Sequence, residues 1–228
     1  MSIRKIAAAC AVLPAAGALA GIYTDPEGDI NSPDGNLDIV GATVSHTDTD
    51  VTISLKLKSL GADWGKYVVL IDSGVASAGN EANPWGRDIV GAKHDYFIGS
   101  WLDGGNDGGA QFFSYSATKG GWATAGNNIS QSVDWNNATI SWTLEGFTTT
   151  LAAAAGPEGG GFGGFHFEIG TTGGGTNDPA IDLLGEEETQ PGWGGTAVST
   201  DMATYMVPAP GALALLGLAG LAGSRRRR

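Results

Sequence analysis

The chain has 228 residues, of which 24 are acidic and 12 are basic, and its formal net charge is −12. Six of the basic residues lie at the two ends, so the segment 21–207 keeps 6 basic and all 24 acidic residues, a formal charge of −18. The electrostatic field of so negative a segment excludes nucleic acid as a partner and favours divalent cations. A solubilising surface explains most of these carboxylates equally well.

The first twenty residues have the order of a secretory signal peptide. Arg4 and Lys5 form a basic start, residues 6–19 are mainly apolar, and Ala18-Leu19-Ala20 is a small-x-small cleavage site. Cleavage after Ala20 makes Gly21 the first residue of the mature chain. The only cysteine, Cys10, lies in the part removed, so the mature chain depends on packing or bound ions rather than disulfides.

An acidic segment, residues 25–38, follows the signal peptide. Oxygen-bearing side chains stand at every second position from Asp25 to Asn31. Calcium takes about six to eight oxygen ligands, and loops that contain Gly and Pro let neighbouring carboxylates converge. The sequence therefore predicts a calcium site whose ligands are Asp25, Glu27, Asp29 and Asp38. The alternative is a solvated acidic leader whose aspartates only form turns; a second acidic run, 103–108, is better explained as such a turn.

The chain then shows the two-residue period of β-strands. In 51–58 the apolar residues Val51, Ile53, Leu55 and Leu57 alternate with polar ones, and a short polar link joins this strand to 37–44 in a predicted hairpin. The segment 66–72 is apolar on both faces, which is typical of a central strand. Further strands are predicted at 94–101, 111–115, 139–145 and 165–169, and a helical turn at 148–155.

Glycine is dense between the predicted strands. The segment 21–207 holds 33 glycines, well above the average usage of about 7%, and their clusters indicate turns and loops. No long helix is predicted. We therefore expect one domain, 21–205, that is an all-β antiparallel sandwich of roughly eight to ten strands, jelly-roll-like, with Gly-rich loops.

The opening of this domain also resembles a known group of sandwiches. Asp25-Pro26-Glu27-Gly28-Asp29, then Leu37-Asp38-Ile39, an alternating hairpin and the strand 67–72 are similar to domains related to family 9 carbohydrate-binding modules and DOMON domains. The resemblance implies a ligand-binding sandwich in which an acidic N-terminal segment can hold calcium.

The tryptophans divide into two classes. Trp142 alternates with Ile140 and Leu144 in a strand and is predicted to be core, whereas Trp101 at a strand end suits either environment. Four other tryptophans stand beside glycine in predicted loops, where an indole face can stack on a sugar ring. The alternative is that they plug the ends of the sandwich. The predicted ligand-binding residues are Trp64, Trp85, Trp122, Trp193 and the neighbouring Arg87.

The C-terminus is a second targeting signal. Pro208-Ala209-Pro210 precedes an apolar run, 211–224, and four arginines beginning at Arg225 end the chain. As a helix that run spans about 21 Å, short of the ~30 Å hydrocarbon core unless flanking residues contribute. The tail, 206–228, resembles the PEP-CTERM sorting signal of Gram-negative bacteria, which implies processing by an exosortase and a link to exopolysaccharide and biofilm matrix. The alternative is a plain tail anchor.

Catalytic motifs are weak. There is no nucleophile elbow or His-Glu-x-x-His, and His166 and Glu168, which share a strand face, more readily form a structural pair. The sequence therefore favours an exported, non-enzymatic protein of the cell envelope or matrix that binds extracellular polysaccharide or serves as a matrix scaffold. The alternatives are a polysaccharide-active hydrolase or lyase and a purely structural surface protein.

Overall fold

The computed structural model describes residues 20–61, 64–74, 79–87, 89, 93–103, 106–154, 162–185, 190–199 and 202–207. Within these ranges no helix is long and apolar enough to cross a membrane. The predicted signal peptide, with Ala18, and the tail from Pro208 through Pro210 and Arg225 lie outside the described residues; Ala20, at the predicted cleavage point, is exposed.

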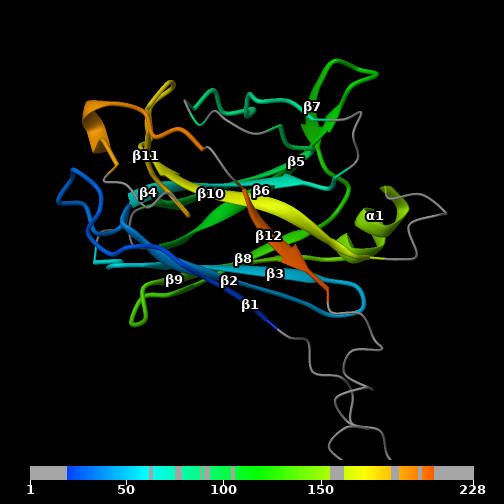
Figure 1. Ribbon diagram of the computed structural model, residues 1–228, viewed down its shortest axis with the longest axis horizontal. Coiled ribbons are helices and arrows are strands. Elements are labelled where there is room, and N and C mark those ends of the chain that lie inside the picture. The colour runs from blue at the N-terminus through cyan, green and yellow to red at the C-terminus, as the bar shows by residue number, and fades with distance from the viewer. Residues whose placement is uncertain are drawn as a thin grey trace, which may run out of the picture.

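The described residues form two antiparallel sheets that face each other, so the predicted all-β sandwich is confirmed (Figure 1). One short α-helix and one 3-10 helix accompany them. The elements are β1 (Gly21–Thr24), β2 (Ile39–His46), β3 (Val51–Leu57), β4 (Trp64–Asp72), β5 (Tyr96–Asp103), β6 (Asn106–Ser116), β7 (Gly121–Thr124), β8 (Ile129–Asp134), β9 (Thr139–Leu144), α1 (Phe147–Ala154), β10 (Gly164–Thr172), β11 (Ala180–Leu183), η1 (Gly192–Gly194) and β12 (Ala203–Met206).

The strand order is that of two joined meanders. One sheet has the order β1-β2-β3-β9-β8 and the other β11-β10-β4-β5-β6-β7, with β12 also paired to β10. Most neighbours are consecutive in the chain, and only β3–β9 and β4–β10 join distant strands within these paths. The order therefore differs from the jelly roll that we expected, in which two Greek keys interleave distant strands.

Every strand predicted from the sequence is present, and so is the helical turn, as α1. The hairpin β2–β3 and the central position of β4, between β10 and β5, are both as predicted. Five strands were missed: β1, β7, β11 and β12 have only four residues each, too few to show a period, and β8 is mostly polar. The described residues thus hold twelve strands, more than expected.

The core between the sheets follows from the alternation of side chains. Ile53 and Leu55 of β3 and Trp142 of β9 are fully buried there. The indole Nε1 of Trp142 donates to Gln131 Oε1 at 2.9 Å, so the core tryptophan has a partner for its polar atom. The predicted core position of Trp142 is confirmed.

A second apolar layer covers the outer face of the sheet that contains β4. Val68, Leu70 and Phe97 point outward from β4 and β5 but are buried under loops. Trp85 lies directly on Gly99, where a Cβ atom would stand 2.2 Å from the indole ring. This contact needs a glycine, and it positions the loop that carries Trp85 and Arg87.

Candidate functional site

The acidic segment between β1 and β2 closes one end of the sandwich, at the left of Figure 1. Polar side chains of the opposite sheet hold its backbone. Tyr67 donates its hydroxyl to Asn36 O at 3.0 Å, and Thr171 donates Oγ1 to Leu37 O at 2.7 Å. Directly after the segment, Asp182 Oδ2 accepts from the backbone N–H of Ile39, the first residue of β2, at 2.6 Å. The segment is therefore part of the folded domain and not a free leader.

Three carboxylates converge behind this segment. Asp25 and Asp29 of the segment meet Asp182 of β11, with one oxygen of each within 4.8 Å of the others. Asp25 and Asp182 are buried, at 7% and 0% exposure. Asp25 Oδ1 accepts from Gly185 N at 2.9 Å, and Asp182 Oδ1 accepts from Leu183 N at 2.9 Å. We call these three residues the carboxylate triad.

The electrostatics of the triad are unfavourable for three anions. Burial raises the pKa of Asp182 to about 8, and the charges of Asp25 and Asp29 add to the rise. Burial also raises the pKa of Asp29. Both carboxylate oxygens of Asp29 are buried and accept no hydrogen bond from the described residues. Buried acceptors without donors cost free energy, and a hard cation with oxygen ligands satisfies them. The triad therefore fits calcium.

The two other predicted metal ligands are not members of the triad. Glu27 is exposed. Asp38 is buried, but its Oδ2 is paired with Lys58 Nζ at 3.0 Å and its Oδ1 accepts from Gly28 N at 3.0 Å. The structure thus brings together two of the four predicted ligands, Asp25 and Asp29, and adds Asp182 from a strand that the sequence analysis missed.

Two of the predicted tryptophans form a pair at the same end of the sandwich. The rings of Trp64 and Trp193 lie 6.4 Å apart at 32°, and both are exposed, at 39% and 46%. Trp193 Nε1 donates to Asp34 Oδ2 at 2.9 Å, and Asn36 Nδ2 donates to Trp64 O at 2.6 Å. The polar atom of Trp193 is therefore held by the acidic segment while part of each ring remains open to solvent.

A third tryptophan lines a cavity of about 250 Å³ beside that pair. Trp85 and Trp101 lie 6.2 Å apart at 54°, and the Arg87 guanidinium stands 5.8 Å from the Trp85 ring. Arg87 donates to Gly174 O at 3.0 Å and also to Gly175 O, which fixes the loop after β10. Burial lowers the pKa of Arg87. The cavity is lined by Lys66, Trp85, Arg87, Trp101, Gly174 and Thr176.

The loop after β10 joins the two tryptophan pairs. Gly173 lies against Trp193, where a Cβ atom would stand 2.7 Å from the ring, while Gly174 and Thr176 line the cavity with Trp85. We call Trp64, Trp193, Trp85, Trp101, Arg87 and Lys66 the tryptophan surface. The sequence left the environment of Trp101 undecided and did not select Lys66. The two residues are paired across β4 and β5, and this pairing brings both to the tryptophan surface.

Trp122 is not part of the tryptophan surface and does not line its cavity. Its ring stacks on His94 with centroids 5.0 Å apart, and its Nε1 donates to Ala82 O at 2.7 Å. It also packs against the second apolar layer. Trp85 packs against the same layer but also lines the cavity, whereas Trp122 does not line it.

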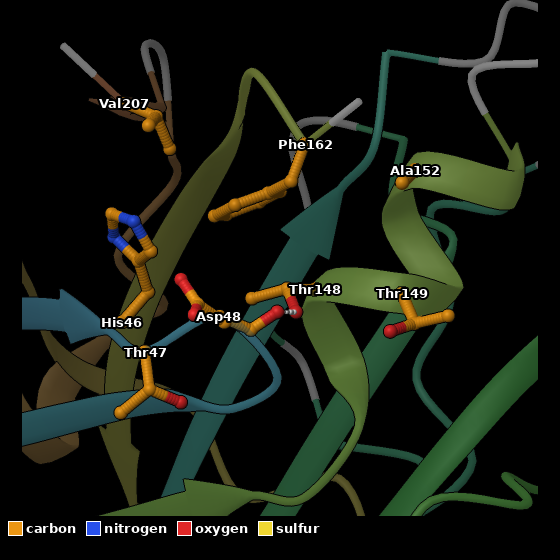
Figure 2. Close-up of a pocket in the computed structure, with 8 residues that line it drawn as sticks. All are labelled: His46, Thr47, Asp48, Thr148, Thr149, Ala152, Phe162 and Val207. Carbon is orange, nitrogen blue, oxygen red and sulfur yellow. Dashed lines mark hydrogen bonds between the residues drawn. The ribbon is translucent and has the colours of Figure 1, made fainter. Parts of the chain in front are cut away.

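A further hollow, of about 320 Å³, lies beside α1 at the other end of the sandwich (Figure 2). His46 stands 5.4 Å from Phe162 and its Nδ1 lies 2.6 Å from the Tyr205 hydroxyl. Thr148 Oγ1 donates to Asp48 O at 2.8 Å. These bonds join the β2–β3 turn to α1 and β12. The predicted site residues do not line this hollow.

No protein-family model matches the chain, and no curated protein matches it in sequence.

Proposed function

We propose that this protein is an exported, non-enzymatic glycan-binding sandwich of the bacterial surface or matrix, and that it binds polysaccharide at the tryptophan surface. The observation that carries the proposal is the junction of two tryptophan pairs around one loop. Indole faces stack on the C–H faces of sugar rings, and charged or hydroxyl-bearing neighbours bind sugar hydroxyls. Lys66, Arg87 and Thr176 are such neighbours.

The position of this surface in the fold suits a protein that is sorted by its C-terminus. Along β10, Gly164 pairs with Met206 of β12 and Thr172 pairs with Lys66. Eight strand steps separate these points, about 27 Å. Since β12 leads into the proposed PEP-CTERM tail, a protein held there at the membrane, before or without exosortase cleavage, presents the tryptophan surface at its far end. The proposed localisation is the envelope or extracellular matrix of a Gram-negative-type bacterium.

The carboxyl groups do not favour the hydrolase or lyase alternative. Two carboxylates about 5 Å apart suit a retaining glycosidase, but Asp25 and Asp182 are too buried to reach a glycosidic bond. His166 and Glu168 have separate partners, because His166 Nδ1 lies 2.8 Å from Thr204 Oγ1 while Ser199 Oγ donates to Glu168 at 2.9 Å. Binding without catalysis is therefore the proposal.

The test is a glycan array with the exported protein, followed by affinity electrophoresis on the glycans that bind. Trp193→Ala and Trp101→Ala should each weaken retention about tenfold or more, the effect of losing a well-packed aromatic contact. Trp122→Phe is the matched control and should lower the melting temperature with retention unchanged. Retention of no glycan would favour the purely structural protein, and release of reducing ends would favour the enzyme.

A further inference from the structure

We propose that a divalent cation, calcium, bound by Asp25, Asp29 and Asp182 holds the acidic segment in the conformation that positions Trp193 and Trp64, so that glycan binding depends on the cation. The dependence of glycan binding on the cation rests on the proposed function. The link between the cation and the two tryptophans is carried by contacts that do not involve a sugar.

The first step is the cation site itself. Asp25 and Asp182 are buried, and Asp29 brings two buried oxygens that accept no hydrogen bond from the described residues. Backbone N–H groups orient the carboxylates of Asp25 and Asp182, as is usual for carboxylates that bind a metal. The nearby ammonium of Lys58 is paired with Asp38 instead. A bound cation therefore supplies the positive charge that the triad needs.

The second step runs from Asp29 to Trp193 through the backbone. Gln190 N donates to Asp29 O at 2.6 Å, and Asn31 N donates to Gln190 O at 2.9 Å, which makes a short parallel bridge. Gly192 has φ 60° and lies so close to Asn31 that a Cβ atom would stand 2.5 Å from its carbonyl oxygen. The turn that carries Trp193 is thus built directly on the residues that follow the metal ligand.

The third step is the tryptophan pair. The acidic segment binds the side chain of Trp193 through Asp34 and the backbone of Trp64 through Asn36. Residues 29–36 therefore contact both members of the pair. If the carboxylates of the triad are not bridged by a cation and Asp29 moves away from Asp182, the bridge to Gln190 and the contacts of Trp193 move with it.

The experiment measures three properties of the exported protein in chelator, in calcium and in matched magnesium: melting temperature, tryptophan fluorescence, and retention on a glycan that the protein binds. We expect calcium to raise the melting temperature, to change the fluorescence saturably and to tighten retention about tenfold or more. Magnesium should do less, because it needs strict octahedral geometry and releases its water reluctantly.

Two variants make the test specific. Asp29→Asn removes a charge from the triad without removing a hydrogen bond and should abolish all three calcium effects. Glu27→Gln removes a charge from the same segment outside the triad and should respond like the native protein. Trp193→Phe should keep the calcium-dependent melting shift and lose most of the fluorescence change.

The outcomes separate the two proposals. If Asp29→Asn and Glu27→Gln respond alike, calcium acts by general screening and the site is refuted. A melting shift that leaves fluorescence and retention unchanged refutes the coupling and leaves the proposed function standing. If no glycan is retained under any condition, the proposed function fails, and the fluorescence of Trp193 still decides the coupling.

Discussion

Asp182 should make the protein less stable as the pH rises when no divalent cation is present. Burial raises the pKa of Asp182 from 3.8 to about 8, and the neighbouring carboxylates of Asp25 and Asp29 add to the effect. At neutral pH the folded protein therefore binds a proton that the unfolded chain has released. This contribution to stability is fully present below about pH 4 and is lost as the pH rises through about 8.

The magnitude follows from the difference between the two pKa values. About four pKa units at roughly 1.4 kcal/mol each give on the order of 5 kcal/mol between pH 4 and pH 8. The hydrogen bonds that Asp182 accepts from the N–H groups of Ile39 and Leu183 lower its pKa, and the value of about 8 already includes their effect. The raised pKa of Asp29 acts in the same direction as that of Asp182.

The assay is urea denaturation in chelator between pH 5 and pH 8, with the native protein and Asp182→Asn. The native free energy of unfolding should fall across this range relative to that of the variant. At pH 5 the variant should itself be less stable by about 1–3 kcal/mol, because one amide oxygen replaces two acceptors for two N–H donors. Parallel pH profiles for the two proteins would refute the reasoning. Saturating calcium should prevent this fall in the free energy of unfolding of the native protein, because the bound cation takes the place of the proton in the triad.

Three further predictions concern packing and processing. Gly99→Ala should displace Trp85, lower stability by about 1–3 kcal/mol and weaken glycan retention; unchanged retention would show that the Trp85 cavity takes no part in binding. Ile53→Ala should lower the free energy of unfolding, measured by urea denaturation, by about 2–5 kcal/mol. Thr52→Ala, on the solvent face of the same strand, should lower it by less than about 1 kcal/mol. Equal losses in the two variants would contradict the assigned faces of the strand. By intact mass, the exported protein should begin near Gly21 and lack Arg225 and the arginines after it; retained arginines would leave only the tail anchor.

The sequence by itself determined the β-class of the domain and most of its strands. The alternation Val51, Ile53, Leu55 and Leu57 specifies one buried face whatever the partner strand is, because successive side chains on a strand point to opposite sides. Trp142 belongs to the same kind of local pattern. Strand order lies beyond such patterns, because β3 pairs with β9 and β4 with β10 across long stretches of chain.

The candidate sites show the same division. Neighbouring glycines correctly marked Trp64 and Trp193 as accessible, since both are exposed, whereas Trp85 is half-buried against the second apolar layer. The same local signal placed Trp122 among them, but its ring stacks on His94, a neighbour that only the folded chain provides. Trp101 and Lys66 join the surface because β4 and β5 are paired in one register.

The acidic segment shows most clearly what only the tertiary structure decided. Its composition alone predicted a cation site with four ligands close in sequence. In the fold, Lys58 pairs with Asp38, Glu27 faces solvent, and Asp182 arrives from β11, more than 150 residues away along the chain from Asp25. Composition determines how many carboxylates a segment offers. Which of them are buried together depends on the strand that packs behind the segment, because burial and charge pairing are properties of residues brought together from distant parts of the chain.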